Sequence, residues 1–191
     1  MKINSTMKEI KFYLKELTVV TIGVLIALFL SNIKEYIQAQ KYQSASIETI
    51  NSEIKSNYTS LKEIVEKQSN LVDSLTKYTE ASNTIVDIFK KSKGLQFATI
   101  HNTGLEFYKR NQINSIDFDM MSTLINMNLL SDIIDNKLDK FADFTYSNAY
   151  NNSKESKMVV LLHLQDVLNT ENQLLKFYKD FIDAKIENDP E

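Results

Sequence analysis

The sequence predicts an all-α protein, in which a single N-terminal transmembrane helix continues into a long helix that folds back as an antiparallel helical hairpin or bundle. Three observations lead to this fold class. The run Leu17–Ile33 is uncharged and almost wholly apolar. The chain after it repeats apolar residues at helical spacing. Only three Gly and one Pro occur in 191 residues, which leaves little material for the tight turns of a multi-stranded sheet.

The apolar run is long enough to cross a bilayer as a helix. At about 1.5 Å per residue it covers roughly 26 Å, close to the hydrocarbon thickness of a membrane. We therefore expect a short cytoplasmic N-terminus at 1–16, a transmembrane signal anchor at 17–33 and an extracytoplasmic helical domain at 34–191. The alternative is a cleaved signal peptide, but Ser31-Asn32-Ile33 after the apolar core is a poor cleavage site.

Lysines near the apolar run predict its orientation. Four precede the run and two follow it shortly after: Lys2, Lys8, Lys11 and Lys15, then Lys34 and Lys41. Because positive residues stay on the cytoplasmic side, this bias places the N-terminus in the cytoplasm and the body in the periplasm, anchored in the inner membrane.

Small residues form a stripe along the anchor. Gly23, Ala27 and Ser31 recur every four residues and therefore share one helix face. Such a face lets two membrane helices approach closely, so it is a candidate packing face for self-association. The alternative is a chance spacing, since small residues are common in membrane spans.

The segment after the anchor has a seven-residue period typical of a coiled-coil seam. The seam positions that we expect to pack on another helix are Ile47, Ile54, Leu61, Ile64, Leu71 and Leu75, with the polar residues Asn57 and Gln68 among them. Two partners are open for this seam: the last helix of the same chain, or the same seam in a second copy.

The remaining boundaries follow from breaks in the pattern. No Gly or Pro lies between Gly23 and Gly94, so we expect one helix from the membrane to about residue 93, ending at Lys90-Lys91-Ser92-Lys93-Gly94. Short helices are expected over 95–130, the second of them with Ser115 as its N-cap. C-terminal helices are expected over 131–187, interrupted at Asn151-Asn152-Ser153. The apolar stripe of the last helix is read as Met158, Leu161, Leu162, Leu168, Leu175, Tyr178, Phe181 and Ile182.

The stretch Lys15-Glu16-Leu17-Thr18-Val19-Val20-Thr21-Ile22-Gly23-Val24-Leu25-Ile26-Ala27-Leu28, followed by Asn32 and Glu35, resembles the anchor helix of a family of small bacterial single-span membrane proteins of unknown function. The chain departs from that pattern at Phe29, Ser31 and Ile33. The resemblance covers about a tenth of the chain. It implies an anchor followed by a helical body and implies no chemistry.

The sequence offers no catalytic, cofactor-binding or metal-binding constellation. It has no Cys, and its two histidines, His101 and His163, are not at ligand spacing from one another. His163 stands in the apolar stripe of the last helix and is interpreted as a packing residue. Asp132, Asp135, Asp139 and Asp143 recur along one helix face, which we interpret as a solvated face rather than a cation site. The net charge of -3 argues against a nucleic-acid partner.

These features favour a non-enzymatic, membrane-anchored helical scaffold that recruits a partner protein at the outer face of the inner membrane. The expected partners are the lipid bilayer and a protein, or a second copy, bound through helices. The alternative is a periplasmic sensory or ligand-binding helical module that acts through a separate signalling subunit. A pilin-like subunit is a remote alternative: Phe12-Tyr13-Leu14-Lys15-Glu16 resembles a mature pilin start, but Lys11 replaces the Gly needed for cleavage.

Overall fold

The computed structural model describes residues 3–111 and 118–188, and the chain divides into two compact units, Met1–Ala45 and Ser46–Glu191. The helices are α1 (Ile3–Lys77), α2 (Ile85–Lys91), α3 (Thr103–Asn111), α4 (Phe118–Ser147) and α5 (Lys154–Asn188). The described residues contain no β-strand. The predicted all-α fold class is therefore confirmed.

The seam of α1 in the second unit follows the expected seven-residue period. Its buried residues are spaced alternately three and four apart from Ile54 onward, the spacing of a face that packs on neighbouring helices. They are Ser46, Ile50, Ile54, Asn57, Leu61, Ile64, Gln68, Leu71 and Leu75. Ile47, the first predicted seam residue, is half-buried, and its neighbours Ser46 and Ile50 take the buried positions.

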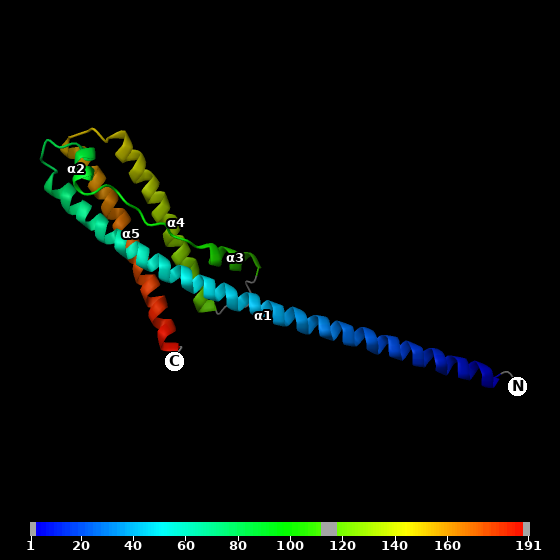
Figure 1. Cartoon of the computed structure of the whole chain (residues 1–191). Coiled ribbons are helices and arrows are strands. Elements are labelled where there is room, and N and C mark those ends of the chain that lie inside the picture. The colour runs from blue at the N-terminus through cyan, green and yellow to red at the C-terminus, as the bar shows by residue number, and fades with distance from the viewer. Residues whose placement is uncertain (1–2, 112–117, 189–191) are drawn as a thin grey trace. The chain divides into compact units, whose positions relative to one another are not determined.

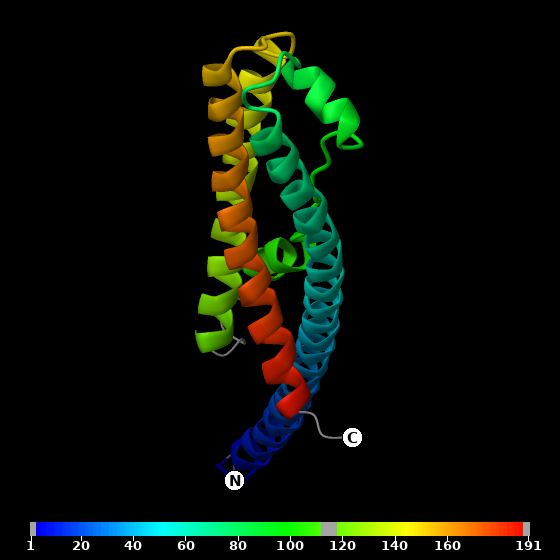
Figure 2. The same ribbon diagram turned by 90° about the vertical axis from the view of Figure 1, so that its left-hand side faces the viewer.

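Helices α4 and α5 run antiparallel and pack closely side by side, and α1 from residue 46 covers their shared face (Figures 1 and 2). One core cluster joins Leu61 of α1 to Leu124 and Ile134 of α4 and to Leu174 and Tyr178 of α5. A second cluster is built from Leu71, Leu75, Ile85, Ile88, Phe141, Val160 and Leu164. The seam of α1 thus packs on the last helices of its own chain, as the predicted antiparallel bundle requires.

The first long helix ends at Lys77, so the predicted end at about residue 93 is wrong. Residues 78–84 form a turn, and α2 begins after it. The break needs no Gly or Pro because Thr84 and Asp87 form a capping box: the Thr84 hydroxyl accepts from the Asp87 N–H at 3.3 Å, and Asp87 Oδ2 accepts from the Thr84 N–H at 3.1 Å. The stop signal at Lys93-Gly94 is used, but it ends α2; both residues have positive φ.

The predicted division of residues 95–130 into two short helices is half right. Helix α3 is short, but residues 118–130 belong to the same helix as residues 131–147. The expected break at Ser131 is wrong because Ser131 lies inside the helix on its buried face, with 4% of its surface exposed. Ser115, the predicted N-cap, lies outside the described residues.

The buried face of α5 is rotated from the predicted apolar stripe. Met158 and Leu162, two members of that stripe, are 44% and 61% exposed. The residues that face the core are Lys157, Val160, Leu164, Val167, Thr170, Glu171, Leu174 and Tyr178. This buried face was not predicted from the sequence because two of its residues, Lys157 and Glu171, are charged. Charged residues are rarely buried without partners. The predicted break at Asn151-Asn152-Ser153 is correct, and Ser153 caps α5 by accepting from the Ser156 N–H.

Candidate functional site

The predicted membrane packing face lies on an open surface. Gly23, Ala27 and Ser31 are exposed, and a Cβ built on Gly23 meets no atom within 4 Å. The large apolar residues of the same stretch, from Leu17 to Ile33, are each at least 40% exposed. Among the described residues, α1 is the one helix long and apolar enough to cross a membrane.

The two histidines serve packing and backbone roles. The half-buried His163 ring lies 5.8 Å from the Phe144 ring, centroid to centroid, which agrees with its interpretation as a packing residue. The His101 backbone is held by Asn57 of α1: the His101 N–H donates to Asn57 Oδ1 at 3.0 Å, and Asn57 Nδ2 donates to the His101 carbonyl at 2.8 Å. This reciprocal pair fixes the extended segment 95–102 against the bundle.

The predicted aspartate face of α4 is exposed along its length. Partial desolvation, and then the charges of Asp132 and Asp139, raise the pKa of Asp135. Across the described part of the chain, no three His, Asp or Glu residues are grouped so that they could hold a metal ion.

A buried polar pair crosses the bundle between α1 and α5. Gln68 is 1% exposed and Glu171 is fully buried, and Gln68 Nε2 donates to Glu171 Oε1 at 3.2 Å. Burial raises the pKa of Glu171 to about 7, although the hydrogen bond from Gln68 lowers it in part. The sequence reading noted Gln68 as a polar seam residue but missed Glu171.

A second buried polar residue of α1, Asn57, contacts Tyr178, a member of the first core cluster. Asn57 Nδ2 lies 3.5 Å from the Tyr178 hydroxyl, to which it donates. Burial is the main cause that raises the pKa of Tyr178, and the hydrogen bond from Asn57 opposes it. The two polar seam positions of α1 therefore both have partners on α5.

Lys157 of α5 holds the turn that follows α1 from inside the bundle. Its side chain is 1% exposed, and its Nζ donates to the carbonyl oxygens of Tyr78, Thr79 and Ala81, the first two at 3.2 and 3.4 Å. These carbonyl groups lie in the turn at 78–84, just beyond the end of α1, and that of Tyr78 also accepts from the Ala81 N–H at 3.2 Å. The ammonium adds a charged donor to all three and complements the negative end of the α1 dipole.

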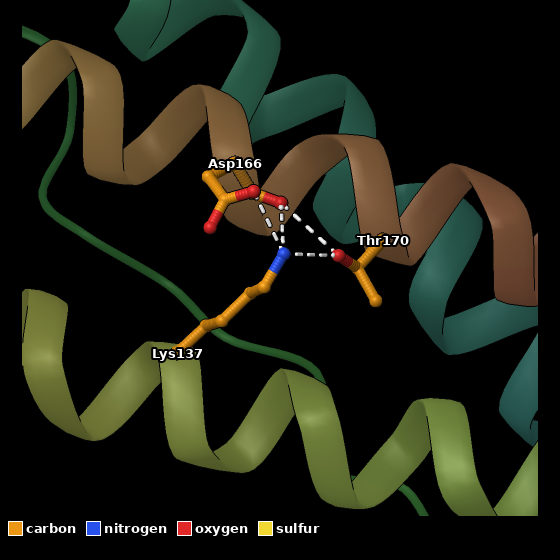
Figure 3. A network of polar contacts seen from close by, with 3 residues as sticks. All are labelled: Lys137, Asp166 and Thr170. Atoms are coloured by element: carbon orange, nitrogen blue, oxygen red, sulfur yellow. Dashed lines mark hydrogen bonds and ion pairs between the residues drawn. The ribbon is translucent and has the colours of Figure 1, made fainter.

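Lys137 of α4 makes a polar contact with α5 (Figure 3). Its Nζ donates to Asp166 Oδ1 at 2.7 Å, to the Asp166 carbonyl at 3.3 Å and to Thr170 Oγ1 at 2.8 Å. The Lys137 side chain is 28% exposed to solvent and that of Asp166 is 61% exposed, so the ion pair is partly solvated. Such a pair adds little stability, and its main effect is to set the register of α4 on α5.

A polar cleft of about 400 Å³ lies between α1 and the segment that follows α2. It is lined by Lys67, Asn70, Ser74, Lys91, Ser92, Lys93, Gly94 and Gln96. Lys67 is held by Glu63 Oε1 at 2.6 Å and Gln96 Oε1 at 2.9 Å, and Lys91 lies 4.6 Å from the centre of the Tyr78 ring. The ammonium groups of Lys91 and Lys93, with several neutral donors, make the cleft suited to a small anion.

The cleft could not be found from the sequence, because its two walls are 17 or more residues apart and meet only through the turn at 78–84.

The spacing of residues in the sequence of α5 weakly indicates that two of its charged residues are buried. Lys157 and Glu171 fall in the same three-and-four spacing as Val160, Leu164 and Leu174, which would place them on the core face.

Comparison of the chain with protein-family models, curated proteins and solved structures finds no match.

Proposed function

We propose that the protein is a non-enzymatic, single-pass membrane protein whose helical body is a scaffold for a partner protein. The observation that carries the proposal is the exposed apolar stretch of α1. Leu17, Val20, Leu25 and Phe29 are each 59–65% exposed, and they belong to the one described helix that is long and apolar enough to cross a membrane. Water is a poor solvent for such a surface, and a bilayer would remove it from water.

The proposed orientation places the N-terminus in the cytoplasm and the body in the periplasm, at the inner membrane. The lysine bias around the apolar run supports this side. The family resemblance of the anchor, with its small bacterial single-span members, supports the same topology.

Fractionation and reporter fusions test the anchor and its orientation. We expect the full chain to remain in membranes after washing with high salt or alkali. A reporter that is active only in the periplasm should be active when fused after Glu191, and a cytoplasmic reporter at the same position should be silent. Release by alkali, or the reverse reporter pattern, would contradict the proposed topology.

The scaffold role is supported by large apolar side chains left exposed on outer faces of a well-packed body. Ile125 and Leu129, one turn apart on α4, are 47% and 55% exposed, and Leu162 on α5 is 61% exposed. Their positions outside the core allow charged substitutions that leave the bundle packing intact.

Co-purification in mild detergent tests the scaffold role. We expect the full chain to bring down a protein in stoichiometric amount, and Ile125→Glu, Leu129→Glu or Leu162→Glu to release it. The matched control is Asn126→Glu, an exposed polar position on α4. Recovery of the chain alone, or retention of the same protein by all three variants, would contradict partner binding through the body.

The lysine-lined cleft favours a second candidate function, a ligand-binding module that acts through a separate subunit. With inorganic pyrophosphate as the probe, we expect calorimetry to detect binding that weakens with added salt and with Lys93→Gln. Lys62→Gln, an exposed lysine of α1 outside the cleft, should leave binding unchanged. Equal loss in the two variants would indicate nonspecific charge attraction.

A further inference from the structure

The buried Gln68–Glu171 pair leaves two oxygen atoms without a hydrogen-bond partner. Gln68 Oε1 and Glu171 Oε2 are both fully inaccessible and unpartnered, while the other ends of the same two groups meet in the 3.2 Å hydrogen bond. An unpaired buried polar atom is costly, so two in one contact call for an explanation.

The orientation of the Gln68 amide is fixed by a third group. Its Nε2 lies 3.3 Å from the backbone carbonyl oxygen of Gln96, which accepts from a donor only. Turning the amide over would place an oxygen against that carbonyl. The unpartnered atom of Gln68 is therefore its acceptor oxygen.

Two acceptor oxygens cannot satisfy each other, but one added hydrogen atom satisfies both. We propose that Glu171 is held in the folded bundle as the neutral carboxylic acid, with its proton on Oε2 donated to Gln68 Oε1. Together with the hydrogen bond from Gln68 Nε2 to Glu171 Oε1, this makes a cyclic acid–amide pair with two hydrogen bonds. The pair is a buried proton-binding site that links the packing of α1 on α5 to proton uptake.

Charged groups on the elements around the pair are engaged elsewhere. On α1, Lys67 is held by Glu63 and Gln96. On α4, Lys137 is held by Asp166 and Thr170 of α5. The pKa of Glu171 accordingly reflects burial, which raises it to about 7, and the opposing hydrogen bond from Gln68, with no contribution from a charged group of the described chain.

The proton link predicts a direction for the pH dependence of stability. The folded state binds this proton more tightly than the unfolded chain, in which a Glu has its ordinary pKa of 4.5. The stabilisation is therefore complete below that value and is lost as the pH rises through about 7. For a shift of this size, the folding equilibrium constant should rise about tenfold between about pH 8 and about pH 6.

Urea unfolding of the full chain in detergent, followed by circular dichroism at several pH values, tests the pair. Glu171→Gln replaces the acid with an amide. The amide can make the same two hydrogen bonds with Gln68, but it has no proton that titrates between about pH 6 and about pH 8. We expect this variant to fold equally well at about pH 6 and about pH 8, without the tenfold change. The matched control Glu66→Gln, an exposed position on α1, should keep the dependence of the natural chain.

Carbon-13 NMR of the labelled side-chain carboxyl gives a readout independent of folding stability. The Glu171 signal, assigned by its absence from Glu171→Gln, should titrate with a midpoint near 7. A midpoint near the ordinary value for Glu, or a Glu171→Gln variant that keeps the pH dependence of the natural chain, would overturn the proposal.

Discussion

Single buried polar residues give this bundle its specificity. Asn57, Gln68, Lys157 and Glu171 occupy core positions that Leu could fill, and each is matched to particular backbone or side-chain atoms. A uniformly apolar seam would allow α1 to slide by a heptad along α5, whereas a misplaced polar residue would be left unpaired. We infer that these residues fix the register of the bundle.

At the residue scale, we expect Lys157→Met to destabilise the body by about 1–3 kcal/mol, because it removes the charged donor from the carbonyl groups of Tyr78, Thr79 and Ala81. Urea unfolding of the full chain in detergent measures the change. Lys154→Met, which removes an exposed ion pair with Glu80, is the control and should change stability by no more than about 1 kcal/mol. Similar effects of the two substitutions would argue against a role of Lys157 in holding the turn.

At the element scale, the buried face of α5 is rotated from the predicted stripe, and this rotation determines which of its leucines are buried in the core. Leu164 is fully buried in the second core cluster, while Leu168, on the predicted stripe, is half-buried at its edge. The face of α5 that meets the seam is thus centred on Leu164 and Leu174 rather than on Leu161, Leu168 and Leu175.

Truncating these leucines separates the two registers. We expect Leu71→Ala and Leu164→Ala each to cost about 2–5 kcal/mol of unfolding free energy, and Leu168→Ala distinctly less. Lys62→Ala on the exposed side of α1 should have little effect. An effect of Leu168→Ala larger than that of Leu164→Ala would restore the register read from the sequence.

The small-residue face of the anchor allows a clean test of self-association. Because a side chain at Gly23 meets no atom of its own chain, Gly23→Ile should leave the fold of the monomer unchanged. If the face of Gly23, Ala27 and Ser31 packs on a second copy, the substitution should abolish cross-linking between copies in membranes. Val24→Ile, one residue off that face, is the control. Equal cross-linking in the natural chain, Gly23→Ile and Val24→Ile would show that this face does not pack on a second copy.

The helix seam of α1 could be predicted because its period depends on its own sequence alone. The turn at 78–84 could not, since the donor that stabilises it, Lys157, lies about eighty residues away and reaches it only in the folded bundle. The sequence nevertheless contains a local sign of this break, because Thr84 and Asp87 have the spacing of a capping box. The Gln68–Glu171 pair is likewise a product of tertiary packing.

At the scale of the whole molecule, the seam packs within one chain rather than between copies. We therefore expect the unfolding midpoint of the full chain in detergent to be independent of protein concentration over about a hundredfold range. Leu71→Ala should lower the midpoint by the same amount at every concentration. A midpoint that rises with concentration both in the natural chain and in Gly23→Ile, which lacks the small-residue face of the anchor, would show that the seam pairs with a second copy.

The first turn of α2 is joined to the loop at 148–153 by backbone hydrogen bonds. The Ile85 N–H donates to the Asn151 carbonyl at 3.2 Å, and the Val86 N–H donates to the Ala149 carbonyl at 2.9 Å. First-turn amides of a seven-residue helix would ordinarily exchange rapidly with solvent deuterium. Here they can exchange only when α2 separates from the loop at 148–153, so they should exchange more slowly than solvent-exposed amides. These two amides would then report how often α2 separates from that loop at this end of the body.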